Sequence, residues 1–474
     1  MIMKGFWFTV LHFIISLKVF IGSNSFAFGE SQDPAVGCNM NELKCYKKIG
    51  LGDYDPDKYQ LNSQFKGIIH KTRIRHIDLT KFDDIDKFCS AQPMPGKFQP
   101  CTGEFSGVKV LMAADRSDLT PWMAPSSIDF ESQLSYPALS HPFASHLIAI
   151  KDAFVNSWGT IFNYEHWYDH GGCTDRATYM KPSFIYEMTK HTILSFNQPV
   201  ISIVHPFSSM YFHEFIEIHA MLLMTQPLIK SFPNITIFIN RHFHHSQLFP
   251  LLTVLGFDKM NDSKTFLRGY NFTTIGSYHG RHYVSYAPWV ITPVSHWCEY
   301  ISRSVTRQMR DGYAKLPYWN DVDVGAGIVV HDRVSVKPKR FLREGQMIFE
   351  SLKEKYGHTH SVRMFFGNET LEEIVKIFRG AKVLIASHGA GLTNMLFMPE
   401  GGMVVEFRPQ QYPNRCFVDL ANNIGIKHYM YEVTTNLKGY EMRVDGTAFL
   451  NKLYPLLIPF VGSPVPRAGT DGEE

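Results

Sequence analysis

The sequence has little charge and no recognisable metal-binding spacing. Charged residues make up 19% of the 474 residues and the net charge is +3, so no strongly basic surface for nucleic acid or acidic lipid is expected. The seven cysteines form no CxxC pair and no HExxH segment occurs, which argues against a structural zinc site. No internal repeat or low-complexity tract is visible. The 45% of apolar residues indicates a packed globular protein.

A long uninterrupted hydrophobic run is also missing near the N-terminus, where Lys18 interrupts the apolar stretch that follows Lys4. The uninterrupted part is shorter than the roughly 20 residues of a membrane-spanning helix. Ser25 and Ala27 provide small residues for signal cleavage. We favour a cleaved signal peptide over a type II signal anchor in residues 1–27. Either one predicts delivery to the lumen of the endoplasmic reticulum or Golgi.

Two further features agree with a lumenal setting. The seven cysteines allow up to three disulfides, although their spacing leaves the pairing open. Four glycosylation sequons begin at Asn234, Asn261, Asn271 and Asn368. Because chance alone supplies sequons in a chain of this length, they add only a little weight.

Apolar periodicity outlines the first part of the chain. Residues 28–105 are rich in Pro, Gly, Asp and Cys, which favours an irregular stem or cap. Residues 107–114 then predict a buried strand. Further on, strands are predicted at 199–204, 235–239 and 282–291, and helices at 210–224, 247–256 and 297–309.

The last third alternates more regularly between strands and helices. Strands are predicted at 327–330, 362–366, 383–386, 404–407 and 428–432, and helices at 345–356, 371–378, 391–397, 417–423 and 449–460. Such alternation predicts right-handed crossovers and a parallel sheet. We therefore expect an α/β fold with two facing Rossmann-like domains, 106–312 and 313–462, with a cleft between them and a disordered tail at 463–474.

A glycine loop follows the predicted strand 383–386 and runs from His388 to Asn394. Loops at the carboxyl ends of parallel strands are where such sheets bind ligands. Gly389 and Gly391 allow the backbone to approach a ligand closely, and the amides that open the next helix favour an anion such as a diphosphate. Local physics leaves an ordinary turn with a capping histidine as the alternative.

Residues 377–407, which contain this loop, resemble the signature of glycosyltransferase family 61. Residues 210–217 are similar to the family's Asn-Tyr-x-His-x-x-x-Asp segment, with Met210 in place of Asn and Glu217 in place of Asp. Residues 330–333 and Arg340 resemble its strand-end arginine and the basic residue that follows. The resemblance covers roughly 199–435. It implies a GT-B fold, a nucleotide-sugar donor, anomeric inversion and a lumenal setting.

The resemblance also assigns donor-binding residues. Arginine suits a departing diphosphate because its charge is permanent, and Glu406 could accept hydrogen bonds from ribose hydroxyls. The alternatives are a structural turn for the glycine loop, a surface salt bridge for Arg333 and a capping carboxylate for Glu406. The expected donor-binding residues are Arg333, Arg340, His388, Gly389, Gly391, Thr393, Asn394 and Glu406.

His213 and Glu217 are the expected catalytic residues. Histidine titrates near neutral pH, as a general base should, and Glu217 lies at i+4 on the same helix face. A buried structural His–Glu pair is the alternative. Asp321-Val-Asp323 fits a short Asp-x-Asp pattern, but a turn explains it as well. With arginine and backbone amides available to neutralise a diphosphate, no metal or other cofactor is required.

The sequence therefore predicts an inverting glycosyltransferase that moves a sugar, GlcNAc being favoured, from a UDP-sugar to a glycoprotein or glycan acceptor. A carbohydrate-binding protein that kept the fold and lost catalysis is the main alternative, because segment 210–217 departs from the family pattern. A nucleotide-dependent oxidoreductase ranks low, since the loop at His388 lacks a third glycine.

Overall fold

A computed structural model describes the following residues: 75–78, 99–100, 104–105, 108–113, 126–127, 146–156, 159–163, 166–169, 193–196, 199–205, 207–208, 210–231, 235–239, 246–257, 271–274, 284–294, 302–322, 326–331, 341–409, 416–435 and 441–463. The chain divides into the compact units Met1–Gln64 and Phe65–Glu474, and every described residue belongs to the second. The predicted signal segment, nearly all of the stem and the tail beyond 463 lie outside the described residues. Within the described part, no helix is long and apolar enough to cross a bilayer.

The first sheet has twelve strands, eight of them in the order β1-β8-β7-β6-β13-β10-β11-β12. The predicted strands near 107–114, 199–204, 235–239 and 282–291 are confirmed as β4, β10, β11 and β13. The strands are β1 Arg75–Asp78, β2 Gln99–Pro100, β3 Glu104–Phe105, β4 Val108–Ala113, β6 His146–Asn156, β7 Ile161–Phe162, β8 His166–Asp169, β9 Ile193–Ser195, β10 Val200–Ser202, β11 Thr236–Ile239, β12 Asn271–Thr274 and β13 Val284–Val294.

This sheet is mixed rather than Rossmann-like throughout. Strands β13, β10, β11 and β12 pair in parallel, whereas β13 with β6, β4 with β6 and β6 with β7 pair antiparallel. The connection from Asn156 to Ile161 is a tight turn, in which Asn156 accepts hydrogen bonds from Gly159 and Thr160. A connection this short forces an antiparallel pair, because parallel strands need a long crossover.

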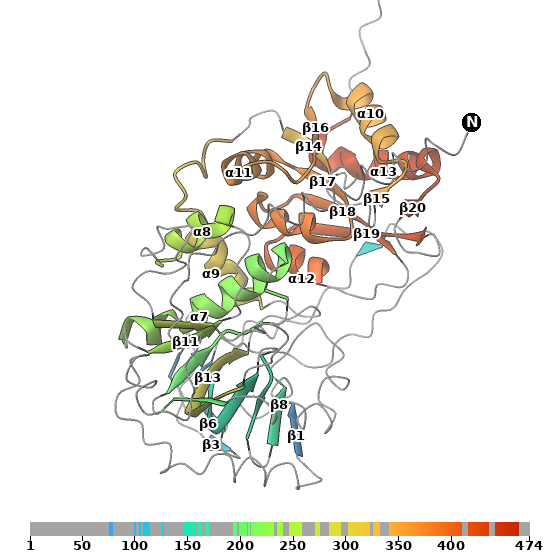
Figure 1. The fold of residues 1–474 in the computed structure, drawn as a ribbon. Helices are drawn as coiled ribbons and strands as arrows, with labels where there is room; N and C mark the ends of the chain where they lie inside the picture. Colours follow the sequence, from blue (N-terminus) through green and yellow to red (C-terminus); the bar gives the residue numbers. More distant parts are fainter. Residues whose placement is uncertain are drawn as a thin grey trace, which may run out of the picture. The chain divides into compact units, whose positions relative to one another are not determined.

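The second sheet has the order β15-β20-β19-β18-β17-β14-β16 (Figure 1). Its five strands from β19 to β16 are parallel, so the parallel sheet predicted for the last third is confirmed. A short strand from much earlier in the chain, β5, adds to β19. The strands are β5 Ser126–Ser127, β14 Ala326–His331, β15 Phe341–Leu342, β16 Ser361–Phe365, β17 Val383–Ser387, β18 Met403–Pro409, β19 Lys427–Thr435 and β20 Glu441–Arg443.

The predicted helices are also present, with two differences. The segment predicted at 210–224 begins as a π-helix, and the one at 391–397 is a 3₁₀ helix. Thr370 caps α11 with a capping box, in which Glu373 is its partner. The helices are η3 His213–Ile218, α7 His219–Ser231, η4 Ser246–Leu248, α8 Phe249–Val254, α9 Arg303–Tyr313, α10 Gly345–Tyr356, α11 Leu371–Gly380, η5 Ala390–Phe397, α12 Cys416–Asn423 and α13 Gly446–Val461.

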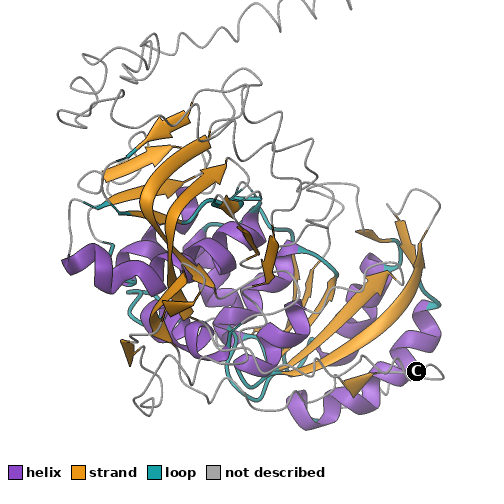
Figure 2. Cartoon of the chain, turned by 90° about the horizontal axis from the view of Figure 1, so that it is seen from below, coloured by secondary structure: helices purple, strands orange, loops and turns teal. Residues whose placement is uncertain are grey.

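Helices lie on both faces of the second sheet (Figure 2), and the side chains of the two faces belong to different core clusters. Alternate residues of a strand point to opposite faces. Ile385 and Val405 therefore pack with α10 and α13, whereas Leu384 and Val404 join a cluster that also contains Ile201 of the first sheet. The side chains of that second face continue toward the carboxyl ends of the strands, where the candidate site lies.

Helices α7, α9 and α12 lie between the two sheets. Helix α7 contacts β13, α12 contacts β19, and α9 contacts both helices. The bridging helix predicted at 297–309 is thus α9, although it starts later, after the cap residue Ser302. Both sheets belong to one compact unit and share a core cluster, so the two domains predicted to meet at 312/313 stay a prediction.

Candidate functional site

The glycine loop is shaped by close approach to a neighbouring strand. Gly389 has φ 153°, in the region that favours glycine. A Cβ on Gly391 would lie 2.1 Å from Nε2 of His331, the last residue of β14. His331 is itself held, because its Nδ1 donates to the carbonyl of Phe365 at 3.0 Å. Gly391 is therefore needed for the loop to pack over β14.

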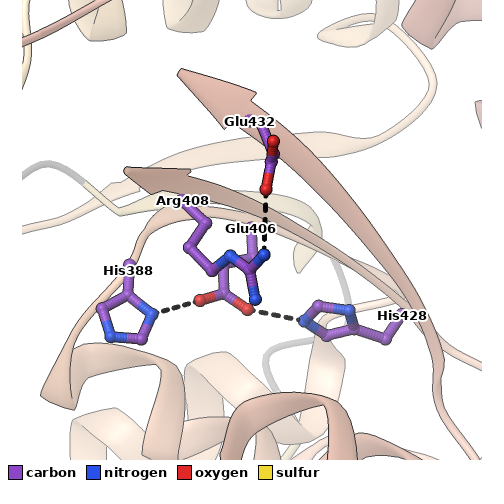
Figure 3. Close-up of polar contacts among 5 residues, drawn as sticks. All are labelled: His388, Glu406, Arg408, His428 and Glu432. Atoms are coloured by element: carbon purple, nitrogen blue, oxygen red, sulfur yellow. Dashed lines mark hydrogen bonds and ion pairs between the residues drawn. The ribbon is translucent and has the colours of Figure 1, made fainter. Parts of the chain in front are cut away.

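A buried carboxylate holds His388, the first residue of the loop. His388 Nδ1 pairs with Glu406 Oε1, and His428 Nε2 binds Glu406 Oε2 at 2.9 Å (Figure 3). Burial would raise the pKa of Glu406, but His388 and His428 lower it to about 2. Both oxygens of Glu406 are thus engaged by imidazoles. Ribose binding by Glu406 stays a prediction, and the geometry favours a role in orienting His388.

Arg408 is a buried cation beside this cluster that sequence analysis missed. It lies two residues after Glu406 on β18, so both side chains project from the same face of the strand (Figure 3). Its Nη2 donates to Glu432 Oε1 at 2.9 Å, and the two residues are in register on neighbouring parallel strands. The sequence feature that could have identified Arg408 is the pair of charged residues, 406 and 408, at the end of an otherwise apolar strand.

The 3₁₀ helix after the loop carries two further predicted donor-binding residues, Thr393 and Asn394, both buried. Asn394 Oδ1 accepts a hydrogen bond from the Tyr211 hydroxyl at 2.9 Å. Within the described part of the chain, the buried hydroxyls of Thr393 and Ser387 have no hydrogen-bond partner. Buried hydroxyls without partners are unusual. Thr393 lies within the glycine loop, so its hydroxyl suggests a ligand or water there, whereas Ser387 shares the opposite strand face with Ile385.

A second buried carboxylate, Glu217, holds His213 on the π-helix η3. The side chain of Glu217 is fully buried, and its Oε2 lies 2.6 Å from His213 Nδ1 and 2.8 Å from His205 Nε2. Burial would raise the pKa of Glu217, but His213 and His205 hold it well below its usual range. The predicted pair is therefore present as a carboxylate bound to an imidazole. His205 is the third member of this group.

The group His205, His213 and Glu217 offers three atoms within 4.8 Å that could ligate a metal. The hydrogen bonding of His205 does not fit that role. Its Nδ1 accepts a hydrogen bond from the Phe207 amide at 3.2 Å, so a neutral ring carries its hydrogen on Nε2. A metal would need the lone pair of Nε2. The cluster therefore fits a hydrogen-bonded carboxylate with two histidines.

The two carboxylate–histidine clusters lie close together. The Phe417 ring packs 5.4 Å from that of Phe212, beside His213, and 5.3 Å from that of His388. Burial raises the pKa of the Cys416 thiol, and Glu406, Asp419 and Glu217 raise it further, so both site carboxylates are within electrostatic reach of one sulfur. Together with the Tyr211–Asn394 bond, these contacts bring the predicted base helix to the predicted donor loop.

Comparison with known proteins assigns the chain to a family. The model of the family Glycosyltransferase 61 matches residues 119–405, more than half of the chain. The chain belongs to glycosyltransferase family 61. The resemblance seen in residues 377–407 is thereby confirmed, and membership makes the protein a glycosyltransferase.

Other comparisons add little to the family 61 assignment. No curated protein matches the chain. Among solved structures, the glycosyl transferase family 9 from Veillonella parvula DSM 2008 aligns with 9% sequence identity and a TM-score of 0.23, over 57% of this chain and 99% of that chain. That likeness is too weak to support an argument.

The structure does not describe two of the expected donor-binding residues of this family 61 glycosyltransferase. Arg333 and Arg340 fall outside the described residues, so their roles stay predictions. Asp323 also falls outside, and the side chain of Asp321 is 62% exposed and lies 3.7 Å from Lys376. Met210, which replaces the family's Asn, is exposed just before the π-helix.

Proposed function

We propose that this glycosyltransferase is an inverting enzyme that transfers a sugar, GlcNAc being favoured, from a UDP-sugar to a glycoprotein or glycan acceptor in the secretory pathway. The observation that carries the proposal is the buried His213–Glu217 pair beside the glycine loop. Inversion needs one displacement, in which a base removes the acceptor proton while the diphosphate leaves. A base and an anion-binding loop at one site suit that reaction.

In the proposed reaction, His213 is the base. Its Nδ1 donates to Glu217, which sets the ring's orientation and assigns proton transfer to Nε2. As the acceptor oxygen attacks the anomeric carbon, Nε2 takes the hydroxyl proton, and the carboxylate stabilises the imidazolium that forms. General-base catalysis of this kind contributes about 10²- to 10⁴-fold to the rate.

The leaving diphosphate is assigned to the loop from His388 to Asn394. Gly389 and Gly391 allow the backbone of the loop to approach an anion closely, and the partnerless hydroxyl of Thr393 lies within the loop. Arg333, predicted at the end of β14, would add permanent positive charge. Such preorganised donors stabilise charge as it develops, and losing one typically costs about 3 kcal/mol of barrier.

Two broader features belong to the same proposal. The parallel second sheet and the helices between the sheets support a GT-B arrangement, with the acceptor entering from the side of the first sheet. Neutralisation of the diphosphate by arginine, histidine and backbone amides would need no divalent metal. The N-terminal segment 1–27 would deliver the enzyme to the endoplasmic reticulum or Golgi.

UDP release from UDP-GlcNAc, UDP-xylose and UDP-arabinose, with and without glycoprotein acceptors, tests the proposal. We expect acceptor-dependent release and a β-linked product from an α-linked donor, which NMR of the anomeric proton detects. His213→Ala should reduce turnover by about 10²-fold or more. His358→Ala, at an exposed histidine, is the matched control and should keep full activity. Glycan binding without turnover would favour the carbohydrate-binding alternative.

A further inference from the structure

We propose that His205 is a positioning residue for transfer, which holds the Glu217 carboxylate against His213 through its own Nε2–H. This inference rests on the proposed function, because it gives His205 a part in orienting the base. It adds a third residue to the predicted pair, contributed by a different element from the π-helix that carries His213 and Glu217.

His205 comes from the carboxyl end of β10, whereas Glu217 lies twelve residues further on. The strand end places the imidazole 2.8 Å from Glu217 Oε2, and both side chains are almost fully buried. The Phe207 amide donates to Nδ1 of the same ring. Because Nδ1 accepts, Nε2 is the atom that carries hydrogen. The 2.8 Å contact therefore sets the partial positive charge of this N–H against the carboxylate.

Both imidazoles bind the same oxygen. His205 Nε2 and His213 Nδ1 converge on Glu217 Oε2 at 2.8 and 2.6 Å. Rotation of the carboxylate would lose the His213 hydrogen bond and the His205 contact in a fully buried site, so the two imidazoles together fix it in one orientation. A fixed carboxylate in turn keeps hydrogen on Nδ1 of His213 and leaves Nε2 as its basic atom, as in other oriented histidine bases.

Ring packing supports the same role. The His205 and His213 rings are stacked, with centroids 5.2 Å apart and an interplanar angle of 26°. The Phe207 ring packs 5.1 Å from His213. His205 thus constrains both the carboxylate that binds His213 and the plane in which the His213 ring lies.

Three substitutions of His205 separate the polar contact of Nε2 with Glu217 from the bulk of the ring. Gln places an amide N–H near the position of imidazole Nε2, Asn places one near Nδ1, and Phe fills the space without donating. We expect His205→Phe and His205→Asn to lower kcat about 10- to 100-fold, the range for partners that orient a functional histidine. KM values for donor and acceptor should stay within about twofold. His205→Gln should keep most of the activity, and His358→Phe serves as the exposed control.

NMR of ¹⁵N-labelled histidine gives a second readout that does not depend on turnover. In the wild type we expect the neutral His213 ring as a single tautomer with hydrogen on Nδ1, and in His205→Phe a mixture of tautomers. A folded His205→Phe protein with unchanged kcat and an unchanged His213 tautomer would overturn the inference. Stoichiometric bound metal with chelator-sensitive activity would also overturn it. Absence of transfer by the wild type would instead refute the proposed function, whereas the tautomer measurement would still test His205.

Discussion

Three buried histidines, His213, His388 and His219, differ in their hydrogen-bond partners. His213 and His388 each bind a buried carboxylate. His219, in α7, has only the neutral Tyr313 hydroxyl at 2.9 Å from Nδ1, and its Nε2 has no partner within the described part of the chain. Burial lowers the pKa of His219 to about 3, so it stays neutral when the protein folds. His219 is therefore a structural residue that lowers the free energy of unfolding as the pH falls.

This environment predicts a measurable pH dependence of stability. In the unfolded chain His219 binds a proton below its ordinary pKa of 6.5, whereas in the fold it does so only near pH 3. The unfolded state therefore binds more protons between these values, and the free energy of unfolding falls as pH falls through that window. One such group contributes about 1.4 kcal/mol per pH unit. Urea unfolding at pH 7, 6 and 5 measures the effect.

His219→Asn should weaken this dependence, because Asn keeps an amide near Nδ1 for Tyr313 and cannot titrate. Below pH 6, the free energy of unfolding of the wild type should fall relative to that of His219→Asn by about 1.4 kcal/mol per pH unit. His358→Asn, at an exposed site, should leave the slope unchanged. Parallel pH profiles for wild type and His219→Asn would contradict the assignment.

At the scale of elements, the end of β14 and the turn before η5 are fitted to each other. A side chain at 391 would overlap the imidazole of His331, which Phe365 holds in place. Gly391→Ala should therefore destabilise the protein by about 1 to 3 kcal/mol, as overpacking does, and weaken UDP binding by moving the loop. Thermal shift with and without UDP measures both effects.

A double-mutant cycle identifies the cause. If the overlap with His331 is responsible, Gly391→Ala should cost less in a His331→Ala background, with a coupling of about 1 kcal/mol or more. Gly425→Ala is a useful comparison, because its φ of 71° introduces backbone strain while the neighbouring side chain lies no closer than 3.6 Å. Strict additivity in the cycle would show that His331 does not limit residue 391.

Elements were more predictable than the contacts between them. The helices at α10 and α11 and the five parallel strands follow from local apolar periodicity, and Thr370 is recognisable because its partner Glu373 lies three residues away. The π-helical turn at His213 was not predicted, since its six residues are all buried and their spacing is typical of an ordinary helix. Turns of this kind often occur at functional sites.

Only those site residues that belong to a recognisable sequence motif were predicted. His213, Glu217 and His388 belong to segments with a recognisable pattern, whereas His205 joins them from the segment after β10 and His428 from β19. Their recruitment depends on strand order and register, for example the alignment of β18 with β19, which no local pattern contains. The mixed character of the first sheet was missed for a related reason, because pairing direction depends on the length of each connection.

At the scale of the whole molecule, the base and the donor loop come from distant segments of the chain. The hydrogen bond from Tyr211 to Asn394 joins them across 183 positions in the sequence. Burial, with a further contribution from Glu214, holds the pKa of Tyr211 far above its usual value, so the phenol remains a hydrogen-bond donor at any physiological pH. Because Tyr211 precedes His213 by two residues, its bond to Asn394 ties the position of the base to the loop assigned to the diphosphate.

Tyr211→Phe should therefore lower the stability of the protein and loosen the alignment of His213 with the donor loop. Loss of the hydroxyl leaves Asn394 Oδ1 buried without this donor, and we expect a loss of about 1 to 3 kcal/mol in the free energy of unfolding. We also expect kcat to fall more than the affinity for UDP, because each half of the site remains intact while their alignment loosens. Urea unfolding, UDP titration and steady-state kinetics on the same preparations separate these effects.

Asn394→Leu and the double variant complete a cycle for this bond. If Tyr211 acts through Asn394, Tyr211→Phe should cost little further kcat once Asn394 is replaced. The double variant should then lose less than the sum of the two single losses, both in kcat and in the free energy of unfolding. Coupling in unfolding alone would mean that the bond only stabilises the fold. Coupling in kcat as well would mean that one hydrogen bond between distant segments keeps the base in line with the departing diphosphate, which is the arrangement that a single displacement needs.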